Sequence, residues 1–207
     1  MNMQEIAQAL GVECGYCHAR MGQQTNGPAA VESVTNAPSK QDIARAMMAM
    51  TRDINSKVQA ATGKQANETT RVTCNTCHHG VTVPGQLSDI ITKTALQKSP
   101  DAAVAQYREL RTHYYGRAAY DFSEETLLTA SQQIVRVKPK DSIPILELNL
   151  EFYPRSVRSY IQIAYAYTRS IDDDRAVAAL EKALEIEPDN GVVKGQLEQL
   201  KSYHRRK

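Results

Sequence analysis

Two short cysteine motifs carry most of the chemistry that this sequence can perform. They span Cys14 to His18 and Cys74 to His78, and together they use all four cysteines of the 207-residue chain. In each motif, two thiols three residues apart can form thioether bonds to the two vinyl groups of one porphyrin, and the following histidine can reach the iron. The spacing predicts two covalently attached haem c groups and a redox protein. The predicted attachment residues are Cys14, Cys17, His18, Cys74, Cys77 and His78, with His18 and His78 as iron ligands.

Other uses of paired cysteines are less favoured. Two pairs could supply a four-thiolate zinc site, and one pair could form a disulfide or a thioredoxin-like redox couple. Neither chemistry needs a histidine directly after each second cysteine. Because the chain has only five histidines, their placement after both pairs favours haem.

The composition argues against nucleic-acid binding, and the haem motifs indicate an exported protein. Lys and Arg are spread along the chain apart from its last three residues, and the formal net charge is +2, so nucleic-acid binding is not expected. No apolar run approaches the roughly 20 residues of a transmembrane helix. Attachment of haem c takes place outside the energy-transducing membrane, which predicts a periplasmic or extracellular protein. Residues 1–10 lack the features of a signal peptide, so we expect that a presequence was removed.

The predicted fold is all-α and has two domains. A dihaem cytochrome domain, organised by its haems, covers residues 1–98, and a short tetratricopeptide-like domain covers 99–207, where nine of the ten tyrosines lie. The boundary is expected within residues 81–100, where Pro84-Gly85 signals a turn and Ser99-Pro100-Asp101 signals the start of a helix.

The first domain needs helices to position its motifs. Residues 1–10 predict a short helix that Gly11 ends, and residues 40–60 predict a longer one that starts at a capping box beginning with Ser39. Residues 19–38 predict a long loop. The longer helix carries an apolar stripe made of Ile43, Met47, Met50 and Ile54.

The second domain resembles helical-repeat proteins. Residues 157–190 fit one 34-residue tetratricopeptide repeat, with small residues where two helices must approach closely. The preceding 34 residues predict a degenerate repeat, and residues 192–203 predict a capping helix. A further helix is predicted from Asp101 to about Tyr115. Two repeats are few for a solenoid, so this domain should need extra burial.

The group on the other face of each iron decides between electron transfer and ligand chemistry. Methionine, histidine and an open position are the candidates. Five of the six methionines lie on the two helices that precede the motifs, which suggests one ligand helix for each haem. His79 adjoins a proximal histidine and is interpreted as a surface neighbour. His113 and His204 are the remaining histidines.

Three segments resemble the cytochrome c subunit family of photosynthetic reaction centres. They are Met3 with residues 9–18, residues 44–55 and residues 72–80, and the resemblance covers about residues 1–84. It implies a helix along each haem plane that delivers a methionine opposite the histidine. Carried over by position, these ligands are Met3 for the first haem and Met47 for the second. Met50 is the fallback for the second haem, and Met48 is interpreted as a core residue.

The resemblance covers two of the four haems of the photosynthetic subunit, so a role in photosynthesis does not follow. The principal hypothesis is outer-sphere electron transfer to redox partner proteins, with the tetratricopeptide-like domain as a docking module. Two alternatives stay open. One is a dihaem peroxidase-like enzyme with an open first iron, and the other is a homo-oligomeric extracellular filament that forms through the second domain and lines up haems across subunits.

Overall fold

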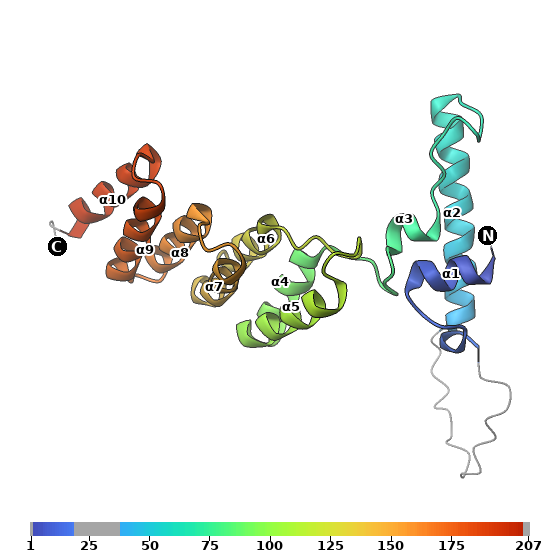
Figure 1. Ribbon diagram of the computed structural model, residues 1–207, viewed down its shortest axis with the longest axis horizontal. Helices are drawn as coiled ribbons and strands as arrows, with labels where there is room; N and C mark the ends of the chain where they lie inside the picture. The colour runs from blue at the N-terminus through green and yellow to red at the C-terminus, as the bar shows by residue number, and fades with distance from the viewer. Residues whose placement is uncertain (1, 19–37, 205–207) are drawn as a thin grey trace, which may run out of the picture. The chain divides into compact units, whose positions relative to one another are not determined.

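The computed structural model describes residues 2–18 and 38–204, and the side chains up to residue 202 (Figure 1). Its described residues form α-helices and short 3-10 helices and contain no strand, which confirms the predicted all-α class. The chain divides into two compact units, Met1–Pro84 (unit 1) and Gly85–Lys207 (unit 2). The loop predicted for residues 19–38 falls, except for its last residue, outside the described part of the chain.

The change of unit falls between Pro84 and Gly85, inside the interval 81–100 expected for the boundary and ahead of residues 98 and 99, where the predicted domains meet. Helix α4 (Leu87–Gln97) lies in that interval and packs against α5 (Pro100–Tyr114) and α6 (Glu124–Ile134). Three of its apolar residues are buried, with spacings of four along the sequence: Leu87, Ile91 and Ala95. Because this face packs on unit 2, α4 belongs there, and the change of unit falls at the Pro84-Gly85 turn.

Unit 1 contains two helices that each precede a cysteine motif, as predicted. Helix α1 spans Met3–Leu10 and α2 spans Lys40–Thr62. Asn2 caps α1 by accepting a hydrogen bond from the Glu5 amide, and Ser39 caps α2 by accepting one from the Asp42 amide. The first motif forms a short 3-10 helix, Cys14–Tyr16, and the second forms the five-residue helix α3, Cys74–His78.

A close backbone contact joins α1 to the chain after α3. The Gly80 amide donates a 2.9 Å hydrogen bond to the Ala9 carbonyl near the end of α1. Gly11 ends α1 at φ 65°, and a Cβ atom added there would lie 2.1 Å from the Gly80 carbonyl oxygen. Both the positive φ and the lack of space require glycine at position 11.

Unit 2 is a series of helices in which α4 packs on both α5 and α6, and each helix from α6 onward packs on the next (Figure 1). Its helix α5 begins after Ser99, whose side chain accepts a hydrogen bond from the Ala102 amide, as the sequence predicted. After α6, a short 3-10 helix precedes the remaining four helices. They are α7 (Ile143–Phe152), α8 (Val157–Arg169), α9 (Asp173–Ile186) and α10 (Gly191–His204).

The core of unit 2 explains why its helices approach closely. Helices α8 and α9 form the hairpin predicted for residues 157–190, and the small residues Ala164, Ala176 and Ala183 are buried between the packed helices. Helix α10 packs on α9, as predicted for a capping helix. A second cluster surrounds the fully buried Tyr107 and Leu127. The assignment of these hairpins to tetratricopeptide repeats stays a prediction.

Candidate haem-attachment site

The first motif is a tight turn. The amides of Cys17 and His18 both donate to the Cys14 carbonyl, at 3.3 and 3.1 Å. This folds the second cysteine and the histidine back over the first cysteine. Cys14 and His18 are exposed, and Cys17 is half-buried, so the thiols and the imidazole remain accessible for attachment.

The first turn of α2 touches this motif. The Gln41 side-chain amide donates to the Cys17 carbonyl oxygen. The neighbouring Lys40 places its ammonium 3.7 Å from the centre of the Tyr16 ring, a cation–π contact. The helix that precedes the second motif in sequence is therefore anchored to the first motif in space.

The second motif holds its histidine in a defined orientation. Nδ1 of His78 lies 2.9 Å from the Val81 carbonyl oxygen, and a carbonyl can only accept a hydrogen bond. Nδ1 therefore carries the proton, and the Nε2 lone pair is left for a metal. The next residue, His79, ends α3 in the left-handed region at φ 48° and has an exposed side chain.

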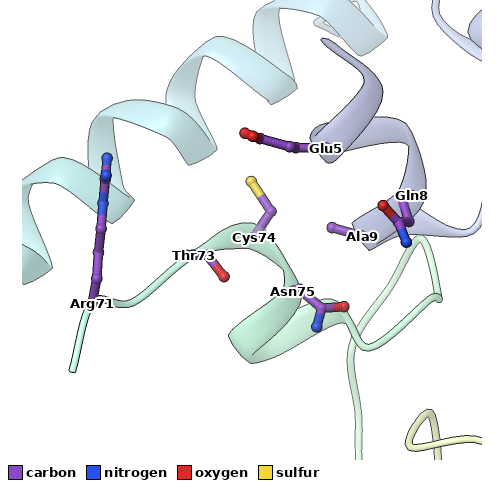
Figure 2. A pocket seen from close by; sticks show the side chains of 7 residues that line it. All are labelled: Glu5, Gln8, Ala9, Arg71, Thr73, Cys74 and Asn75. Atoms are coloured by element: carbon purple, nitrogen blue, oxygen red, sulfur yellow. The ribbon is translucent and has the colours of Figure 1, made fainter. Parts of the chain in front are cut away.

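A pocket of about 430 Å³ opens beside the second motif (Figure 2). One wall comes from α1, and the other comes from the start of α3 and the segment before it. In Figure 2 the Cys74 thiol points away from the α3 backbone toward the side on which Glu5 lies. The lining residues are Glu5, Gln8, Ala9, Arg71, Thr73, Cys74 and Asn75.

Candidate methionine ligands are exposed on α1 and α2 of unit 1. Met3, the first residue of α1, is 63% exposed, while Met47 and Met50 on α2 are 42% and 48% exposed. Ile43 on the same stripe is also exposed. Met48 is half-buried, which agrees with its interpretation as a packing residue. An exposed stripe of large apolar side chains calls for a covering group.

These features fit haem c. The site offers thiols in accessible positions, an imidazole with Nε2 available, thioether side chains and an apolar stripe that a porphyrin can cover. Among the side chains that the structure describes, no three of His, Cys, Asp or Glu gather as metal ligands.

The two remaining histidines, His113 and His204, belong to unit 2. His113 belongs to α5 of unit 2, where its Nδ1 lies 2.9 Å from the Glu109 carbonyl oxygen. The side chain of His204 is outside the described residues. Sequence reasoning gave no role to Gln41 or Asn55, whose side-chain amides bond to backbone far along the chain.

The comparison with protein families decides the relationship. Residues 29–153, more than half of the chain, match the family described as photosynthetic reaction centre cytochrome C subunit. The chain belongs to this family. Membership in the reaction-centre cytochrome family indicates covalently bound haem c and a role in electron transfer.

The matched range includes the second motif, Cys74 to His78, but begins after the first motif. The assignment of the first motif therefore rests on its own sequence and geometry. No curated protein matches the chain. In the part of the chain that the structure describes, no helix is both long enough and apolar enough to cross a membrane.

Proposed function

We propose that this member of the reaction-centre cytochrome family is an exported dihaem c-type cytochrome that transfers electrons between partner proteins. When bound, each haem supplies one-electron oxidation and reduction at iron. The observation that carries the proposal is the pair of complete attachment motifs in unit 1, each preceded by a helix that exposes methionine.

The residues of each motif have separate tasks in this proposal. Cys14 and Cys17 bind one porphyrin through thioether bonds, and Cys74 and Cys77 bind the other. His18 and His78 are the proximal ligands. The hydrogen bond from His78 Nδ1 to the Val81 carbonyl fixes the ring orientation and the tautomer that leaves Nε2 for iron.

Met3 and Met47 are the proposed ligands on the opposite faces. A thioether stabilises the ferrous state, so a haem with histidine and methionine ligands has a relatively high potential. Two protein ligands on each iron would leave no open position for a substrate. The protein would therefore act as an electron carrier, with the bound haems supplying the one-electron chemistry.

Unit 2 is the proposed docking module for redox partners or for further copies of the chain. It buries two hydrophobic clusters of its own, and no residue of the predicted haem sites lies in it. Comparing the full chain with a chain that ends at Pro84 tests this role. Both forms should carry two haems, and partner binding should be lost in the shorter one. Unchanged binding would reject unit 2 as the docking module.

Counting haems by intact mass tests the proposal itself. The matured chain should carry the mass of two haems. A variant with Cys14→Ala and Cys17→Ala should carry only the second haem, and one with Cys74→Ala and Cys77→Ala only the first. A matured chain without added mass would contradict the proposal, as would the loss of both haems in each variant despite normal export.

A second candidate function depends on one observation. Met3 is the most exposed of the three candidate methionines and lies at the very start of α1. If its thioether does not reach the first iron, that haem has an open position and can bind small molecules, as in a dihaem peroxidase. Peroxide-dependent oxidation of a dye by the matured protein, abolished by His18→Ala, would favour this enzyme over the carrier.

A further inference from the structure

The side chain of Asn55 ties α2 to the segment that enters the second motif. Its Nδ2 donates to the Val72 carbonyl at 2.8 Å, and its Oδ1 accepts from the Val72 amide at 2.8 Å. Val72 lies two residues before Cys74. One side-chain amide therefore uses both hydrogen-bonding groups of the Val72 backbone, so the segment can neither slide along α2 nor turn over without breaking both bonds.

The same amide continues a chain of hydrogen bonds along α2 towards Met47. Asn55 Nδ2 also donates to the Thr51 carbonyl at 2.9 Å, and Thr51 Oγ1 donates to the Met47 carbonyl at 2.8 Å. Thr51 is only 7% exposed, the lowest value on α2. The backbone at Met47 is thus linked through two successive side chains to the segment before Cys74.

This linkage sets which face of α2 is presented to the second motif. At 3.6 residues per turn, Met47 lies roughly 80° around the helix from Asn55. A rotation of α2 by one residue, roughly 100°, would move the exposed methionine stripe away from its present direction. Contacts between α2 and α3 are sparse, so the two bonds from Asn55 to Val72 carry much of the connection between α2 and the segment that enters the second motif.

We propose that Asn55 is a positioning residue, which fixes the rotation of α2 against the second attachment motif so that the Met47 thioether is presented to the iron that His78 binds. The inference rests on the proposed function, since it assigns this residue a role in the second haem site. It concerns ligand placement, and Asn55 itself touches neither the iron nor the reacting groups.

Three substitutions separate positioning from general stability. Asn55→Leu has similar size and removes all three hydrogen bonds of the amide. Asn55→Asp keeps an acceptor for the Val72 amide but places a carboxylate against the Val72 carbonyl, where a donor is needed. Ser56→Ala is the matched control, because Ser56 is the adjacent exposed residue on the same helix.

The measurements are haem content by intact mass, the near-infrared band of methionine bound to ferric iron, and carbon monoxide binding to the reduced protein. Both Asn55 variants should retain two haems. Their near-infrared band should fall to about half, because one of two methionine ligations is lost, and one haem should bind carbon monoxide. The Ser56→Ala protein should match the wild type.

Asn55 variants that keep the near-infrared band at full strength and do not bind carbon monoxide would overturn the inference. If Asn55→Leu yields no haem protein, Asn55→Asp and Thr51→Val, which breaks the bond to the Met47 carbonyl, decide the question by the same two readouts. The wild type distinguishes the two proposals. A wild type without two haems refutes the proposed function, whereas a normal wild type with unchanged variants refutes only the role of Asn55.

Discussion

The two units of this chain differ in what they bury. In unit 2, two clusters of apolar side chains are removed from solvent, and Tyr107, Leu127 and Ile145 are fully buried. In the described part of unit 1, the buried hydrophobic residues are Ala9 and Val81, while Met47 and Met50 of α2 are exposed. Unit 2 is stabilised by its own side chains, whereas the described residues of unit 1 form no comparable core.

This contrast indicates where the missing core of unit 1 comes from. Full burial of a large apolar side chain contributes about 1.5–3 kcal/mol, and small domains without enough such burial need a covalent or metal-based constraint. Two covalently attached porphyrins would supply both apolar surface and cross-links. The account therefore predicts that unit 1 folds with haem and that unit 2 folds without it.

The largest expected effect follows from blocking haem attachment. In a chain produced without haem, we expect unit 1 to be largely unfolded and unit 2 to remain intact. Amide hydrogen exchange followed by mass spectrometry should show fast exchange in α1, α2 and α3 and strong protection in α6 to α9. Equal protection of both units in the haem-free chain would contradict the prediction that unit 1, and not unit 2, needs haem to fold.

A substitution in the core of unit 2 should destabilise unit 2 alone. Leu127→Ala removes a fully buried side chain and should lower the unfolding free energy of unit 2 by about 2–5 kcal/mol. The haem absorption spectrum should not change. Denaturant unfolding followed by circular dichroism and by haem absorbance checks both statements, with the exposed Val137→Ala as control. Loss of the haem spectrum along with unit 2 would show that the units fold together.

The glycine contact tests the packing inside unit 1. Gly11→Ala introduces a methyl group 2.1 Å from the Gly80 carbonyl oxygen at a positive φ, and should destabilise the haem-loaded unit 1 by about 1–3 kcal/mol. Gly63→Ala is the matched control, since Gly63 has φ 66° and nothing within 4 Å of the added methyl group. Thermal unfolding monitored by haem absorbance compares the two. Equal losses would mean that only the backbone angle matters.

The smallest effect is a pH dependence that belongs to unit 2. Burial of the Tyr107 hydroxyl raises its pKa from 10.0 to about 12. The folded state therefore holds this proton more tightly than the unfolded state. The contribution of Tyr107 to the unfolding free energy is fully present below pH 10 and is lost as the pH rises towards 12. Tyr107→Phe should flatten this part of the profile, which urea unfolding at several pH values would show. An unchanged slope would assign the effect to other groups.

Local signals in the sequence were enough to predict most helices. Ser39, Ser99 and Gly11 mark ends that the structure confirms, because caps act on the neighbouring backbone and can be recognised without tertiary structure. Helix α4 is not among the predicted helices. Its cap residue, Gln86, makes no side-chain cap hydrogen bond, and its local signals are the acidic Asp89 in the first turn and a four-residue apolar spacing.

In the candidate site, too, local patterns can be predicted from the sequence and long-range contacts cannot. The spacing of Cys and His within five residues is a local pattern, and it predicted the attachment residues. The partner of Asn55 is the Val72 backbone, 17 residues away, and the partner of Gln41 is the Cys17 carbonyl, 24 residues away. Such pairs arise only when the chain folds, so residue type and spacing did not identify them. Met47 is exposed beside the half-buried Met48, a difference that also depends on how the chain folds.

A redox-titrated absorption spectrum of the matured protein, recorded into the near infrared and repeated after carbon monoxide is added to the reduced form, tests the central claim most directly. The account predicts methionine-to-iron absorption that corresponds to two haems and no change with carbon monoxide. A band of half this strength, together with carbon monoxide binding by one haem, would contradict the saturated electron carrier and indicate an open iron.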